Sequence, residues 1–138
     1  MHEIVDAGTW GRSKTPVRMV VAKGKKGLTG YASEVTGPLL AALEEYFEIP
    51  YPFGKLDNLA IPQTVGFGAM ENPGLVTYVD RLILADPARQ TIERQRAYAG
   101  TAAHENAHMW FGDYVTMKRR DDIWLNEGFA TWMAGKIV

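Results

Sequence analysis

The sequence contains no cysteine, so disulfide bonds and thiolate metal ligands are excluded. Any metal site must therefore be built from histidine, carboxylate or other nitrogen and oxygen ligands, and the cellular compartment stays open. The sequence also has no run of about 18 apolar residues, so we expect no membrane-spanning helix. Its N-terminal segment lacks the apolar stretch of a secretory signal peptide.

The sequence also lacks an excess of charge of one sign, because it contains 15 Lys and Arg residues and 16 Asp and Glu residues. The formal net charge of -1 indicates neither a nucleic-acid-binding surface nor a polybasic membrane patch. The hydrophobic content of 46% and the charged content of 22% are typical of a folded globular protein. At 138 residues we expect one domain that spans residues 1–138, with no nucleic-acid partner.

The hydrophobic pattern predicts strands in the first part of the chain and helices in the last part. Short apolar runs predict strands over residues 17–22, 56–61 and 75–84. Helical spacing predicts helices over residues 31–47, about 91–111, and from about 126 onward. We therefore expect an α+β fold, with a sheet-rich part over about 1–85 and two helices over about 91–138.

Two histidines four residues apart, His104 and His108, are the first candidate metal ligands. Side chains four apart lie on the same face of a helix, so both imidazoles can bind one ion. Glu105 lies about 100° further around the helix, where it can reach a water molecule on that ion. The alternative is a surface helix that carries two histidines by chance. An alanine-rich helix that runs into Met109-Trp110-Phe111 argues against that alternative.

A catalytic zinc site needs a third protein ligand and an open position for water. The only other histidine, His2, is at the start of the chain, so a carboxylate is expected. The downstream candidates are Asp113, Asp121, Asp122 and Glu127. Glu127 is favoured because it begins a predicted helix whose residues Phe129, Trp132 and Met133 can pack on the histidine helix. Asn126 or a nearby aspartate is a candidate for orienting an imidazole.

Such a ligand set predicts hydrolytic chemistry. A metal ion held by two neutral imidazoles and one carboxylate keeps a positive charge, which lowers the pKa of bound water and polarises a carbonyl group. Glu105 would act as the general base and later protonate the leaving amine. Amide hydrolysis is the expected reaction, and ester or epoxide opening is chemically possible.

Two motifs resemble a known family. His104-Glu105-x-x-His108, followed after eighteen residues by Glu127 in the segment NEGFA, is similar to the zinc signature of the aminopeptidase N group. This group belongs to peptidase family M1, gluzincins that also include the leukotriene-epoxide hydrolase. The upstream segment GAMEN, residues 68–72, resembles the second motif of the family. The similarity covers nearly the whole chain.

The resemblance implies a thermolysin-like catalytic core that binds one Zn²⁺ and removes single residues from peptides with a free N-terminus. It implies the zinc ligands His104, His108 and Glu127, with Glu105 as general base. Glu71 would bind the substrate's α-amino group, which agrees with the pairing of a carboxylate with an ammonium ion. The other residues implied in substrate binding are Gly68 and Ala69 through their backbone, Met70 in the side-chain pocket, and Asn72.

The sequence departs from the family pattern in three places. Pro73 follows the GAMEN segment where many aminopeptidases have tryptophan, and proline there is similar to the epoxide-hydrolase branch. Arg119 and Arg120 stand where the family usually carries two tryptophans, and they have no assigned role. In the family, the tyrosine that stabilises the tetrahedral intermediate lies well downstream, whereas this chain stops 11 residues after Glu127, and neither Tyr98 nor Tyr114 is at the matching position. We therefore expect a piece of the catalytic domain with flanking domains, and the alternatives are an epoxide or ester hydrolase and a catalytically silent zinc-binding fragment.

Overall fold

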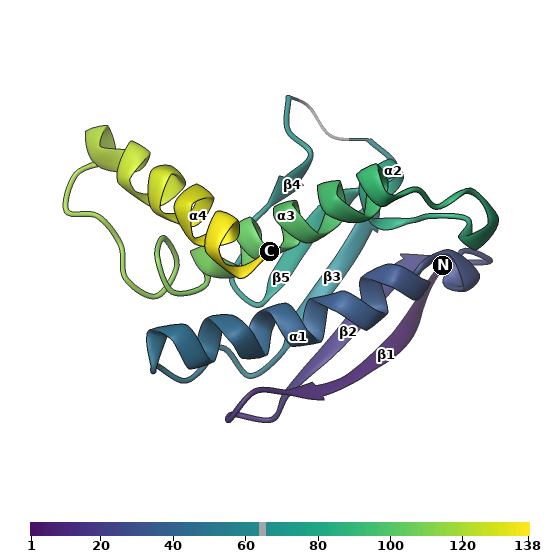
Figure 1. Cartoon of the computed structure of the whole chain (residues 1–138), viewed down its shortest axis with the longest axis horizontal. Helices are drawn as coiled ribbons and strands as arrows, with labels where there is room; N and C mark the ends of the chain where they lie inside the picture. The colour runs from purple at the N-terminus through teal and green to yellow at the C-terminus, as the bar shows by residue number, and fades with distance from the viewer. Residues whose placement is uncertain (64–65) are drawn as a thin grey trace.

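The computed structural model describes residues 1–63 and 66–138. It contains a five-stranded mixed sheet, and helices α1 and α3 lie across one face of this sheet (Figure 1). The strands are β1 (His2–Trp10), β2 (Thr15–Ala22), β3 (Leu56–Ile61), β4 (Ala69–Met70) and β5 (Leu75–Val79). The α-helices are α1 (Gly30–Phe47), α2 (Asp80–Ile83), α3 (Ile92–His108) and α4 (Ile123–Ile137). Three 3₁₀ turns are η1 (Lys26–Leu28), η2 (Pro87–Arg89) and η3 (Arg120–Asp122).

The strand order is β1-β2-β3-β5-β4, with the parallel strands β2, β3 and β5 in the middle and antiparallel strands at both edges. Because β2 and β3 are parallel, they need a crossover connection, and α1 provides it. Strand β2 alternates buried and half-buried residues, as expected for a strand with one face against helices. Its buried side chains are Thr15, Val17, Met19 and Val21.

The core lies between the sheet and the two helices that cover it. Helix α1 buries Leu39, Leu40 and Leu43, which share one face of the helix. Helix α3 packs mainly against α1 and α4, and it buries four small residues that allow helices to approach closely; these are Ala99, Ala102, Ala103 and Ala107. The Tyr98 hydroxyl and Thr36 Oγ1 are 2.6 Å apart and join α3 to α1.

Most predicted elements are confirmed, but several bounds were wrong. The prediction missed β1, because the adjacent Ile4 and Val5 and the following Gly8 give no clear alternation of apolar and polar residues; the strand pairs with β2. The strand predicted over 75–84 ends at Val79, because α2 turns the chain there and buries Ile83. Helix α3 ends at His108, and α4 begins at Ile123 rather than near Asn126. In the sequence, α1 comes between strands β2 and β3, so helices and strands alternate and the fold is mixed α/β.

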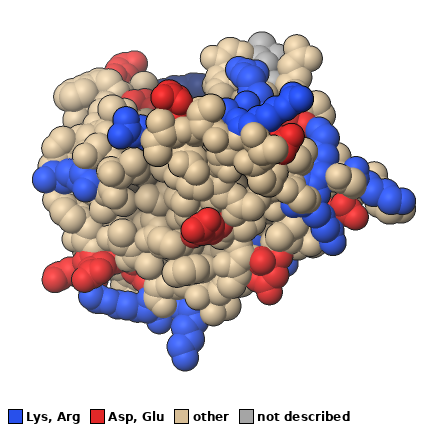
Figure 2. All heavy atoms as spheres, turned by 45° about the vertical axis from the view of Figure 1, so that its right-hand side comes forward, with Lys and Arg blue, Asp and Glu red and all other residues tan. Residues whose placement is uncertain are grey.

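Charged side chains of both signs occur on the surface. Figure 2 shows a face of the molecule on which side chains of both signs are spread around uncharged surface. Within the described residues, no helix combines the length and the apolar character that a membrane span requires.

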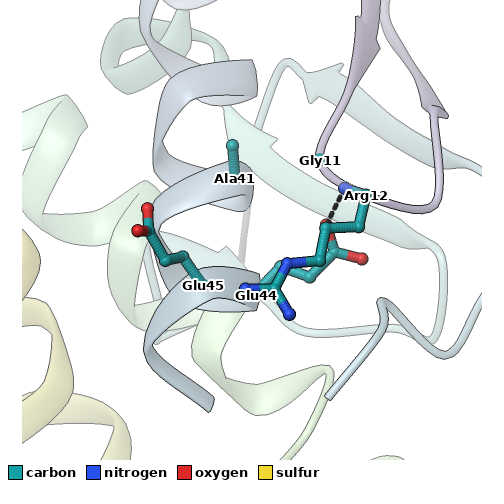
Figure 3. Close-up of a pocket in the computed structure, with 5 residues that line it drawn as sticks. All are labelled: Gly11, Arg12, Ala41, Glu44 and Glu45. Carbon is teal, nitrogen blue, oxygen red and sulfur yellow. Dashed lines mark hydrogen bonds between the residues drawn. The ribbon is translucent and has the colours of Figure 1, made fainter. Parts of the chain in front are cut away.

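A buried carboxylate, Glu44 of α1, fixes the turn between β1 and β2 (Figure 3). It accepts hydrogen bonds from the Arg12 backbone N–H, from the Ser13 hydroxyl at 2.6 Å and from the Tyr51 backbone N–H at 2.9 Å. At Gly11 (φ +72°) a Cβ would lie 2.0 Å from Glu44 Oε2, so a side chain there would displace the carboxylate. Burial alone would raise the pKa of Glu44, but these hydrogen bonds outweigh it and the pKa is lowered.

Glu44→Gln should lower the free energy of unfolding at pH 7 by about 1–3 kcal/mol, because the amide cannot accept all three hydrogen bonds. A lowered carboxyl pKa stabilises the fold above the ordinary pKa of about 4.3 and loses that effect as the pH falls through the folded pKa. Urea unfolding should therefore show a smaller difference from wild type below pH 4. The control is Glu45→Gln, which changes the exposed glutamate next to Glu44. Equal stability of the two variants at pH 7 would contradict this role.

Candidate metal centre

Two helices bring His104, His108 and Glu127 together. The Nε2 atoms of His104 and His108 are 3.1 Å apart. Oε2 of Glu127 lies 3.2 Å from His104 Nε2 and 3.6 Å from His108 Nε2. One nitrogen or oxygen atom from each residue therefore falls within 4.8 Å of the others, as expected for ligands of a single metal ion.

The two histidines are placed by α3, and Glu127 is placed by the packing of α4 against α3 (Figure 1). Helix α4 buries Ala130 and Met133. The ring centroids of Phe129 and Phe111 are 4.0 Å apart, which holds the middle of α4 beside the segment that follows α3. Trp132, which was expected in this contact, is half exposed and carries Lys136 over its ring.

The outer ring nitrogen of each histidine also has a partner. His108 Nδ1 lies 3.1 Å from the Phe111 carbonyl oxygen. A carbonyl oxygen only accepts, so Nδ1 donates and Nε2 keeps its lone pair for the centre of the cluster. Gly112 makes this possible, since it has φ +137° and a Cβ there would lie 3.2 Å from His108 Nδ1. His104 Nδ1 lies 3.4 Å from the Thr131 hydroxyl oxygen.

Negative charge accumulates around the cluster. Burial, followed by the nearby carboxylates Glu71 and Glu127, raises the pKa of Glu105 to about 8. Burial and then Glu71 raise the pKa of Asp113 to about 6. For His104, burial and the neighbouring His108 lower the pKa and favour the neutral imidazole that binds metals.

An open cavity of about 530 Å³ adjoins the cluster. Among its described lining residues are three carboxylates, Glu71, Glu105 and Glu127, and neither a lysine nor an arginine. Clustered carboxylates are stable only with a compensating cation or when protonated. The donor set of two imidazoles and a carboxylate therefore fits a divalent metal ion.

Four residues of the GAMEN segment line this cavity, and the fifth does not. Gly68, Ala69, Met70 and Glu71 line it together with His104 and Glu105. They form and flank β4, the edge strand that pairs with β5. Asn72 is outside the lining, and its side-chain Nδ2 donates to the Met70 carbonyl at 3.4 Å.

The sequence comparison identifies the family of this chain. Residues 31–138 match the model of the Peptidase family M1 domain. The chain belongs to peptidase family M1. The resemblance found in the two motifs is thereby confirmed.

Curated relatives of this M1 chain are named as aminopeptidases. Glutamyl aminopeptidase of Rattus norvegicus is 41% identical over 132 residues, which cover 96% of this chain and 14% of the relative. Aminopeptidase M1-A of Oryza sativa subsp. japonica is 42% identical over 97% of this chain and 15% of the relative. Aminopeptidase N of Acetobacter pasteurianus is 42% identical over 86% of this chain and 34% of the relative. The chain thus spans between a seventh and a third of these relatives.

The partners of the outer imidazole nitrogens were not predicted from sequence. The Phe111 carbonyl is a backbone group, and no residue type signals it. Thr131 lies four residues after Glu127 on α4, so helical spacing places the two on the same helix face. With Glu127 predicted as a ligand, this spacing could have indicated Thr131 as well. Asn126, which had been considered for this role, lies with its Nδ2 beside Gly112.

Asn106, inside the HExxH motif, should weaken the M1 core. It is fully buried, and neither its Oδ1 nor its Nδ2 has a hydrogen-bond partner among the described residues. Asn106→Leu has the same branching without polar atoms, so it should raise the free energy of unfolding by about 1–2 kcal/mol. Asn106→Asp, of matched size, should lower it. Thermal or urea unfolding of both variants checks this, and a destabilised leucine variant would contradict it.

Proposed function

We propose that this chain carries the catalytic centre of a zinc-dependent aminopeptidase with a thermolysin-like core. The single domain 1–138 would bind one Zn²⁺ through His104, His108 and Glu127. The observation that supports this most is the convergence of their Nε2 and carboxylate atoms within 4.8 Å from two separate helices. The aminopeptidase names of the relatives support the same activity.

The ligand types favour zinc. Two imidazoles and one carboxylate, with no thiolate in the chain, match a common catalytic zinc set that leaves a position open for water. When bound, zinc would lower the pKa of that water and polarise the scissile carbonyl group. The Phe111 carbonyl holds the His108 ring with its Nε2 lone pair directed inward.

Glu105 is the proposed general base. It lies next to His104 on α3 and lines the cavity without belonging to the ligand cluster. Its carboxylate would accept a proton from the attacking water and donate it to the departing amine. Burial and the nearby carboxylates raise its pKa, and the positive charge of a bound zinc ion would oppose that effect and favour the ionised carboxylate.

The substrate proposed is a peptide with a free N-terminus. The Glu71 carboxylate would pair with the terminal ammonium and so limit cleavage to the first residue. Gly68 and Ala69, at the edge of the sheet, would offer backbone groups to an extended peptide. Met70 would contact the first side chain, and Asn72 would hold the backbone that follows β4. Segments that flank this region in longer relatives would complete the cleft.

Zinc stoichiometry tests the ligand set. The purified chain should bind one equivalent, and Glu127→Ala should bind far more weakly because a two-imidazole site lacks its third ligand. Glu105→Gln is the matched control, since it changes a neighbouring carboxylate outside the cluster and should keep the zinc. Full zinc binding by Glu127→Ala would contradict the proposed site.

Substrate pairs test the role of Glu71. An aminoacyl-nitroanilide should be hydrolysed in preference to its N-acetylated form, which has no ammonium group. Glu71→Gln should lower kcat/KM for the free amine by roughly 10–100-fold, the effect of losing about 1.5–3 kcal/mol from a charge-assisted hydrogen bond. Turnover of the acetylated compound at the same rate would show that the enzyme is not an exopeptidase.

A further inference from the structure

One helix face of α4 contacts both ring nitrogens of the same imidazole. Glu127 and Thr131 are four residues apart and lie on successive turns. Oε2 of Glu127 is 3.2 Å from His104 Nε2, and Oγ1 of Thr131 is 3.4 Å from His104 Nδ1. The His104 ring is therefore bracketed by two residues of a single helix.

The two histidines differ in what holds them. The side chain of His108 is 1% exposed, and its Nδ1 is held by the Phe111 carbonyl at the end of its own helix. The side chain of His104 is 23% exposed, so the protein encloses it less tightly. Its Nδ1 contact comes from α4, which also supplies Glu127. Orientation of His104 thus depends on the second helix.

We propose that Thr131 is a positioning residue for His104, an inference that rests on the proposed zinc centre. The Nδ1–H of His104 donates to the Thr131 hydroxyl oxygen, which fixes the tautomer whose Nε2 lone pair faces the metal. A hydroxyl does this without adding charge, whereas the cavity already contains the carboxylates of Glu71, Glu105 and Glu127.

A purely local role for the hydroxyl is the alternative. A threonine inside a helix often donates to the carbonyl four residues earlier, as Thr101 of α3 does to Ala97 at 2.9 Å. Thr101 therefore provides a matched control on the helix that carries the histidines. Replacing either threonine with valine removes a hydroxyl and keeps the side-chain shape.

The test measures zinc affinity by competition with a chelator for four proteins: wild type, Thr131→Val, Thr131→Ser and Thr101→Val. Loss of a group that orients a ligand typically weakens metal binding by about 10–100-fold, so we expect at least about a tenfold loss for Thr131→Val. Thr131→Ser should restore the affinity to near wild type, and Thr101→Val should leave it unchanged.

A spectroscopic readout separates positioning from a general loss of stability. In the zinc-loaded protein, the His104 Hδ1 proton should give a slowly exchanging NMR signal in wild type and Thr131→Ser and not in Thr131→Val. Equal zinc affinity and an unchanged Hδ1 signal in Thr131→Val would overturn this inference alone. A wild-type chain that binds no zinc would overturn the proposed function and this inference with it.

Discussion

The packing of α4 against the C-terminal half of α3 is the constraint on which the site depends. Helical spacing alone places His104 beside His108, but it provides only two nitrogen ligands. The third group, Glu127, belongs to a different helix. It lies beside the two histidines because the buried residues Ala130 and Met133 and the Phe111–Phe129 contact hold α4 against α3. The same packing brings Thr131 to the outer nitrogen of His104.

The edge of the sheet forms part of the cavity beside these two helices. The buried alanines of α3 allow close packing with its neighbouring helices, and β4 at the edge of the sheet lies beside the same cavity as His104 and Glu127. The carboxylates of Glu71, directly after β4, Glu105 of α3 and Glu127 of α4 line one cavity, where burial and the neighbouring carboxylates raise the pKa of Glu105. A divalent cation would compensate this charge, so the metal and the fold are expected to stabilise one another.

Local patterns made much of the molecule predictable, and tertiary packing accounts for the rest. The strand at 56–61, the helix over 31–47 and the helical pairing of His104 with His108 follow from spacing in the sequence. Strand β1 was not predicted because its sequence shows no clear alternation of apolar and polar residues, although it pairs with β2 along most of its length. The contact between the Phe111 carbonyl and His108 Nδ1 was not predicted, because a backbone carbonyl leaves no signal in the sequence. Its position depends on the turn at Gly112.

A crystal structure of the zinc-loaded chain, with anomalous scattering measured at the zinc edge, would show whether one ion binds between α3 and α4. We expect one anomalous peak at about 2.0–2.2 Å from Nε2 of His104, Nε2 of His108 and a carboxylate oxygen of Glu127. A zinc peak bound elsewhere, with Glu127 turned away from both imidazoles, would contradict this expectation.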